Sequence, residues 1–154
     1  MTSGKHVLIA SDHAGLALKN ELKTLLPEWT WEDLGAFDST SVDYPDVATL
    51  LGKKIASGSA EQGVLICGSG IGMSIAANKT PGVRAAVVEN PVAARLSREH
   101  NHANVLCLGS RFTAPEYGAE IVKTWLNTPY SRDPRHLRRV RKITTREADF
   151  TEKG

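Results

Sequence analysis

The segment Gly63-Val64-Leu65-Ile66-Cys67-Gly68-Ser69-Gly70-Ile71-Gly72 decides the fold class of this chain. Residues 64–67 are apolar without polar alternation, which is typical of a strand buried on both faces of a parallel sheet. Three glycines at alternate positions then lead into a helix predicted over 71–78. A buried strand, a glycine turn and a helix begin a βαβ unit, so the segment predicts an α/β protein.

The same alternation of strand and helix continues in both directions from this segment. Apolar, β-branched runs predict five strands, at residues 6–10, 29–34, 63–67, 84–88 and 105–108. Helical spacing and first-turn prolines predict helices at 16–26, 45–57, 71–78, 91–100 and 115–126. We therefore expect a three-layer α/β/α Rossmann-like sandwich with a five-stranded parallel sheet and right-handed crossovers. The order of the last two strands is left open.

One further basic helix, from 134 to about 146, is predicted beyond this layered core. Its stretch contains a single acid, Asp133, and seven bases: Arg132, Arg135, Arg138, Arg139, Arg141, Lys142 and Arg146. Arg135 and Arg139 lie four residues apart, so they share a helix face and present two guanidinium groups suited to one phosphate. A solvated face and RNA binding are the alternatives. RNA binding is disfavoured by the small size of the basic patch, its lack of aromatic residues and the pI near 8.6.

Length and composition predict a single domain over residues 1–154. The 154 residues are enough for one core, and no apolar run has signal-peptide or membrane-spanning length. The two cysteines, Cys67 and Cys107, lie in or at the end of apolar runs, which favours free thiols in a reducing compartment. We expect a cytoplasmic protein without disulfides or a membrane partner.

Three polar segments follow the first, third and fifth predicted strands, at residues 11–15, 67–72 and 109–111. In doubly wound sheets, ligands bind beyond the carboxyl ends of the strands, where the strand order reverses. If the first and third strands are neighbours, one crevice holds Asp12, His13, Cys67 and Ser69.

The glycine loop directs several backbone amides at one anion, either a phosphate or a developing oxyanion. A tight turn without a ligand is the alternative. A Walker loop would need a lysine after its last glycine and a dinucleotide fingerprint would need a glycine at Met73. Glu89 lies at a strand end, where an acidic residue could bind a ribose. A nucleotide-binding regulatory module is therefore an alternative function of a different class.

Cys67 stands at a strand end beside a helix amino terminus, a setting that stabilises a thiolate as base or nucleophile. A buried core thiol is the alternative, and it is our prediction for Cys107. Phosphoryl transfer is disfavoured because Met73 replaces the arginine that would close a phosphatase loop. His100 could move a proton near neutral pH or cap its helix. No ligand cluster joins His100 and His102, so we expect no metal.

Taken together, several segments resemble the type B ribose-5-phosphate isomerase family, which also contains isomerases of allose, galactose and four-carbon sugar phosphates. The match runs from about residue 7 to 144 and is carried by segments in one order along the chain: 11–15, 43–45, 67–72, 75–79, 100–101, 109–111, 135–136 and Arg139.

The resemblance implies an aldose–ketose isomerase of the pentose phosphate pathway, without a cofactor, acting on ribose 5-phosphate through a cis-enediolate. The same family isomerises tetrose 4-phosphate, allose 6-phosphate or galactose 6-phosphate, so the sugar length is left open. It also implies a homodimer, or dimer of dimers, whose sites are completed by the partner's basic helix. No function is predicted for 147–154.

The resemblance also implies roles for individual residues. Cys67 would be the base, because Met73 occupies the position of the carboxylate used by another branch of the family. Ser69, where threonine also occurs, would help move protons between the oxygens, and His100, aided by Asp12, would open the sugar ring. The remaining substrate-binding residues would be His13, Tyr44, Gly68, Gly70, Ile71, Gly72, Asn101, Arg111, Arg135 and Arg139.

Overall fold

The computed structural model describes residues 5–151 and has an α/β architecture. The strands are β1 (His6–Ser11), β2 (Thr30–Asp33), β3 (Gly63–Cys67), β4 (Ala85–Val87) and β5 (Val105–Gly109). The helices are α1 (Leu16–Leu25), α2 (Tyr44–Ala56), α3 (Ile71–Ala77), α4 (Pro91–Asn101), α5 (Pro115–Asn127) and α6 (Pro134–Thr151), with a short 3-10 helix, η2 (His13–Gly15), before α1. The predicted strands and helices are confirmed, whereas η2 was not foreseen.

The five strands pair in parallel in the order β2-β1-β3-β5-β4, which places β5 between β3 and the edge strand β4. β1 is hydrogen-bonded to β3, as the shared crevice required. Ser11 pairs with Ile66, and Cys67 pairs with Gly109, so the carboxyl ends of β1, β3 and β5 meet at one edge. The chain leaves β1 for β2 on one side, and β3 lies on the other, which makes this edge a topological switch point.

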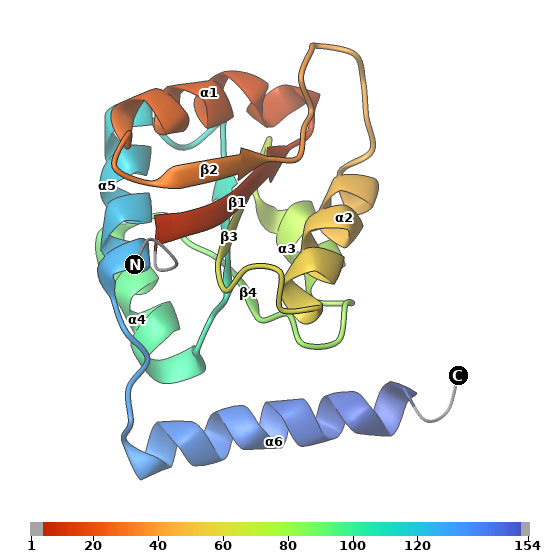
Figure 1. Ribbon diagram of the computed structural model, residues 1–154, viewed down its shortest axis with the longest axis vertical. Coiled ribbons are helices and arrows are strands. Elements are labelled where there is room, and N and C mark those ends of the chain that lie inside the picture. The colour runs from red at the N-terminus through yellow and green to blue at the C-terminus, as the bar shows by residue number, and fades with distance from the viewer. Residues whose placement is uncertain (1–4, 152–154) are drawn as a thin grey trace.

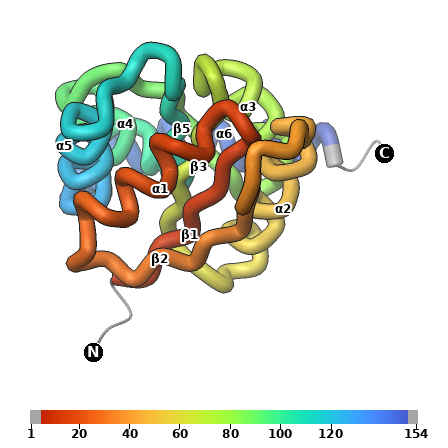
Figure 2. The backbone as a smooth tube through the Cα atoms, turned by 90° about the horizontal axis from the view of Figure 1, so that it is seen from above, coloured from red at the N-terminus to blue at the C-terminus, as the bar shows by residue number. Residues whose placement is uncertain are grey.

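Helices cover both faces of the sheet, as expected (Figure 2). On one face, Val64 and Ile66 pack in a core with side chains from α1, α4 and α5. On the other, Leu65 and Cys67 pack with α2 and α3. Successive strand residues point to opposite faces, so a strand between two helical layers must be apolar at every position. This confirms the inference drawn from the unbroken apolar run of β3.

α6 stands apart from these layers and lies along the lower side of the molecule, packed against α4 (Figure 1). The helix continues through Thr151, beyond the predicted end near 146, because residues 147–150 contain no glycine or proline to stop it. Most of its side chains are exposed, including the apolar Ile143 at 50% and Phe150 at 68%. Within residues 5–151, no helix has the length and apolar character needed to cross a membrane.

Candidate active site

Main-chain hydrogen bonds join the three loops that leave β1, β3 and β5. Asp12 N–H donates to the carbonyl of Ile66 at 3.2 Å, and Ser110 N–H donates to that of Cys67 at 2.9 Å. Arg111 N–H donates to the carbonyl of Gly68 at 3.0 Å. These bonds continue the pattern of the sheet past the strand ends, so the loops form one connected rim.

Glycine is required at two positions of this rim. Gly70 has a φ of +77°, the left-handed region that favours glycine, and it turns the chain directly into α3. A Cβ at Gly109 would lie 2.5 Å from the carbonyl oxygen of Ser69. The glycine loop can therefore lie against the end of β5 only because position 109 has no side chain.

The rim encloses a crevice of about 420 Å³ that gathers most of the predicted site residues. Its lining residues are Asp12, His13, Ala14, Tyr44, Cys67, Gly68, Ser69, Ile71, Gly72 and Arg111. The prediction that Asp12, His13, Cys67 and Ser69 share one crevice is confirmed. Gly70, also predicted, belongs to the same loop.

Cys67 is 4% exposed and lies at the head of the glycine loop. Its Sγ accepts a hydrogen bond of 3.1 Å from Gly70 N–H, at the amino terminus of α3. Cys67 is therefore held at the head of the glycine loop by a backbone donor and lines the crevice.

Two amides of the same loop are left for a ligand. Ser69 Oγ accepts from Ile71 N–H at 3.2 Å, so its own hydroxyl hydrogen is directed elsewhere. Within the described part of the chain, the N–H groups of Ser69 and Gly72 donate to no protein acceptor. Unpaired amides beside a buried thiol are the donors that an oxyanion requires.

The surroundings of Cys107 differ from those of Cys67. It lies one strand away on β5, is fully buried and packs in the core beside α2 and α3. Burial raises the pKa of the Cys107 thiol, and the neighbouring Cys67 raises it further. Cys107 is thus a neutral core residue, as predicted.

Arg111 and His13 bring donors to the mouth of the crevice. A Cβ on Gly68 would lie 3.1 Å from Arg111 Cζ, so the guanidinium lies flat against the glycine next to Cys67. His13 Nδ1 accepts from Val42 N–H at 3.2 Å, which ties the loop between β2 and α2 to the crevice. Both side chains are mainly exposed and can contact a ligand.

The remaining predicted residues lie elsewhere in the same chain. His100 and Asn101 end α4, and Arg135 and Arg139 lie on α6. A helix that follows a parallel strand begins at the carboxyl edge of the sheet and ends at the opposite edge, so His100 lies far from Cys67. The predicted aid of Asp12 to His100 does not occur within one chain.

Two of them, His100 and Arg135, contact His136, which is only 6% exposed. The rings of His100 and His136 stack with centroids 4.2 Å apart and planes 15° from parallel. Arg135 Nη2 lies 3.2 Å from His136 Nε2. The sequence assigned no role to His136; its only signal was its place beside Arg135 in the segment that resembles the family.

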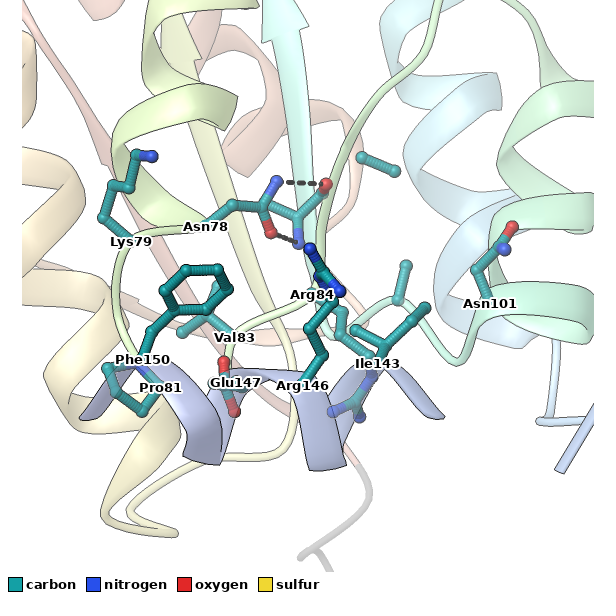
Figure 3. A pocket seen from close by; sticks show the side chains of 13 residues that line it. Asn78, Lys79, Pro81, Val83, Arg84, Asn101, Ile143, Arg146, Glu147 and Phe150 are labelled. Atoms are coloured by element: carbon teal, nitrogen blue, oxygen red, sulfur yellow. Dashed lines mark hydrogen bonds between the residues drawn. The ribbon is translucent and has the colours of Figure 1, made fainter. Parts of the chain in front are cut away.

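A cavity of about 750 Å³, larger than the crevice, lies away from it, between α6 and the loops around β4 (Figure 3). Ile143, Arg146, Glu147 and Phe150 reach it from α6, and Glu147 accepts a hydrogen bond from Gly82 N–H at 2.9 Å. Its lining contains no nucleophile beside an anion-binding loop. The chemistry therefore points to the smaller crevice, although Asn101 lines the larger cavity.

Two alternatives from the sequence can be checked against this geometry. Glu89 is exposed after β4, and β5 separates that strand from β3, so Glu89 does not line the crevice as a dinucleotide-binding acid would. Among residues 5–151, no three His, Cys, Asp or Glu side chains gather as a metal site.

Comparisons with known proteins agree with one another. A family model described as Ribose/Galactose Isomerase matches residues 7–143. A putative sugar phosphate isomerase of Bacillus subtilis is 45% identical and covers 96% of this chain and 98% of its own. Ribose-5-phosphate isomerase B of Escherichia coli is 43% identical, covering 93% and 97%. The structure of a type B ribose 5-phosphate isomerase from Trypanosoma cruzi has a TM-score of 0.91 at 44% identity, covering 97% and 99%.

Relatives of this kind are named for sugars of different length. A D-erythrulose-4-phosphate isomerase of Pectobacterium atrosepticum is 38% identical and covers 80% of this chain and 84% of its own. Overall similarity therefore identifies the reaction class more closely than the sugar.

Proposed function

This chain belongs to the ribose/galactose isomerase family and is an aldose–ketose isomerase, and from that premise we propose that it interconverts ribose 5-phosphate and ribulose 5-phosphate with Cys67 as base. The observation that carries the proposal is the pairing of a buried thiol with a glycine loop in one crevice. Cys67 Sγ accepts the Gly70 amide, and the Ser69 and Gly72 amides are free for an oxyanion.

The proposed reaction moves one proton from C2 to C1 and one from the oxygen on C2 to the oxygen on C1, and it leaves the overall oxidation state unchanged. The Cys67 thiolate removes the proton from C2 of the open-chain aldose, and the electron pair forms a cis-enediolate. The thiol then returns a proton to C1, which gives the ketose. The Ser69 hydroxyl carries a proton between the two oxygens. Because the isomerisation is redox-neutral, this route needs no redox cofactor.

The loop amides supply the largest stabilising effect in this scheme. An enediolate concentrates negative charge on oxygen, and preorganised donors in a site with little water stabilise it more than the neutral sugar. Removal of one such donor typically costs about 3 kcal/mol of barrier. The unpaired amides of Ser69 and Gly72 support this assignment.

The substrate extends from Cys67 toward cationic side chains. His13 and Arg111 bind the phosphate from the crevice of one subunit, and Arg135 and Arg139 bind it from the basic helix of the other. Tyr44 and Asn101 contact the sugar. His100 opens the sugar ring, aided by Asp12 across the interface.

These roles fall on residues of two subunits, so the proposal requires a homodimer, or a dimer of dimers, with shared sites. The separation of His100 from Cys67 within one chain supports it. So do exposed apolar side chains of α3 and α4, Ile71 at 54%, Ile75 at 58% and Val92 at 59%, because their burial against a second copy would stabilise an assembly.

An activity panel tests the proposal and its substrate alternatives. Purified protein treated with a chelator is assayed with aldose phosphates of four, five and six carbons, including tetrose 4-phosphate, allose 6-phosphate and galactose 6-phosphate. The highest kcat/KM is expected with ribose 5-phosphate. A higher kcat/KM with another sugar phosphate would identify that sugar as the substrate within the same family. Absence of turnover with every sugar phosphate tested would overturn the proposed function.

A further inference from the structure

We propose that His136 is a positioning residue that holds the ring of His100 and orients the guanidinium of Arg135. The inference rests on the proposed function, in which His100 opens the sugar ring and Arg135 binds the phosphate. It assigns both to one buried side chain, so that the ring-opening group and the phosphate-binding group keep a fixed geometry.

The contact between the two histidines defines the first half of this role. His136 is 6% exposed, and its ring covers one face of His100 at 4.2 Å, nearly parallel. A histidine near a helix end has several accessible side-chain rotamers, and a stacked ring excludes those that would move the imidazole off its neighbour. His136 therefore fixes the plane in which His100 presents its nitrogens.

The contact with Arg135 defines the second half. A guanidinium only donates hydrogen bonds, so His136 Nε2 accepts from Arg135 Nη2 at 3.2 Å and the neutral ring carries its proton on Nδ1. Asp133 accepts the backbone N–H of Arg135 at 2.8 Å, which holds the start of α6. Arg135 is thus restrained at its backbone and at its charged end.

The segment that leads into α6 is held against the end of α4. Arg98 donates to the carbonyls of Thr128 at 3.0 Å and Ala103 at 2.7 Å. The His102 ring stacks on Tyr130 at 4.3 Å. These contacts hold residues 128–130, just before α6, against the end of α4, which favours the stack of His136 on His100.

The surrounding charges favour a neutral His136. Burial lowers the pKa of His136, His100 and Arg135 lower it further, and Arg139 adds to this effect, whereas Asp133 opposes it. Arg98, Glu99 and His102 are the other charged or titratable groups at this end of α4, and Tyr130 faces them from the segment before α6. Two stacked imidazoles do not readily carry two positive charges, which also favours the neutral form of His136.

Three variants separate the two contacts. His136→Phe keeps a stacking ring but removes the acceptor for Arg135, whereas His136→Gln keeps an acceptor but removes the ring. His136→Ala removes both. The aldose reaction is followed by kcat and KM, and exchange of the C1 proton of the ketose with solvent deuterium is followed separately, because an acyclic ketose needs no ring opening.

We expect His136→Ala to lower kcat for the aldose at least about tenfold and to raise KM, with ketose exchange at saturation retained. His136→Phe should recover kcat but not KM, and His136→Gln should recover KM but not kcat. In a His100→Asn background, His136→Ala should lower kcat no further.

Parallel measurements of helix content and oligomeric state verify that each variant is folded. An unchanged aldose reaction in folded His136→Ala, or equal losses in the aldose reaction and in ketose exchange for all three variants, would overturn the positioning role. Failure of the proposed function is distinguishable, because the unsubstituted protein would then turn over none of the sugar phosphates.

Discussion

The phenol ring of Tyr44 lies across the backbone of Gly72, so close that a Cβ at position 72 would be 2.6 Å from Tyr44 Cζ and 2.9 Å from its hydroxyl oxygen. The first residue of α2 is thereby placed over the first turn of α3, at the edge of the crevice. Glycine at 72 thus leaves space for the ring of Tyr44, beside an amide that is open to a ligand.

Gly72→Ala should therefore lower kcat/KM by about 10- to 100-fold, because Tyr44 must leave its position beside the substrate. Steady-state kinetics measures the effect. A double-mutant cycle provides the control: in a Tyr44→Ala background, adding Gly72→Ala should cost much less than it does alone. Equal costs in both backgrounds would show that the ring contact is irrelevant.

Cys67→Ala should lower kcat by at least about 100-fold, because it removes the proposed base beside the glycine loop. Thermal unfolding verifies that the variant is folded. Cys107→Ala is the matched control, since it removes the same atom from a core position one strand away, and it should keep its activity. An active, folded Cys67→Ala protein would disprove the base assignment.

Mixing two impaired variants tests whether sites are shared between subunits. Cys67→Ala and His100→Asn would each greatly lower the aldose activity of a homodimer, but a mixed dimer contains one site with both original residues. After denaturation and joint refolding at equal amounts, about a quarter of the original activity should return. Without such recovery, Cys67 and His100 do not act across an interface.

Acid stability should depend on Asp33, which lies at the end of β2 and accepts hydrogen bonds from Lys19 at 2.8 Å and Lys23 at 2.7 Å. Burial raises the pKa of Asp33, but Lys19, Lys23 and the Gly35 amide outweigh it, so the net pKa is lowered. A lowered pKa in the folded state stabilises the protein above the ordinary pKa, and this contribution is lost as pH falls through the folded-state value.

Asp33→Asn should reduce the free energy of unfolding by about 3–5 kcal/mol at neutral pH, since Lys19 is fully buried and loses its partner carboxylate. The difference from the original protein should shrink below about pH 4. Urea unfolding across this pH range measures it. Glu21→Gln, which removes an exposed carboxylate on α1, should show no comparable loss; a pH-independent effect of Asp33→Asn would refute the electrostatic explanation.

The sequence predicted the layers and the crevice because both depend on local patterns. Unbroken apolar runs fixed the buried strands, and the glycines after Cys67 fixed the turn into α3. The end of α6 was predicted too early, because a polar composition after Arg146 indicated a tail although nothing there terminates a helix. η2 was missed because it depends on a hydrogen bond from the Gly15 amide to the Asp12 side chain, and these two residues are only three apart in the sequence.

The positions of His100 and His136 were harder to predict for a different reason. Their contact joins the end of α4 to the start of α6, and no periodicity in either segment reports on the other. The distance of His100 from Cys67 did follow from topology, since a helix after a parallel strand must end at the far edge. Combined with the resemblance, that rule supports a site built from two subunits.

The rim of the crevice is held by main-chain bonds, from Ser110 to Cys67, from Arg111 to Gly68 and from Asp12 to Ile66. Such bonds do not depend on which side chains the rim carries. Evolution can therefore exchange residues that face the sugar, such as Tyr44, without disturbing the geometry of the base and its amides. One backbone can in this way keep the same reaction while its substrate specificity changes.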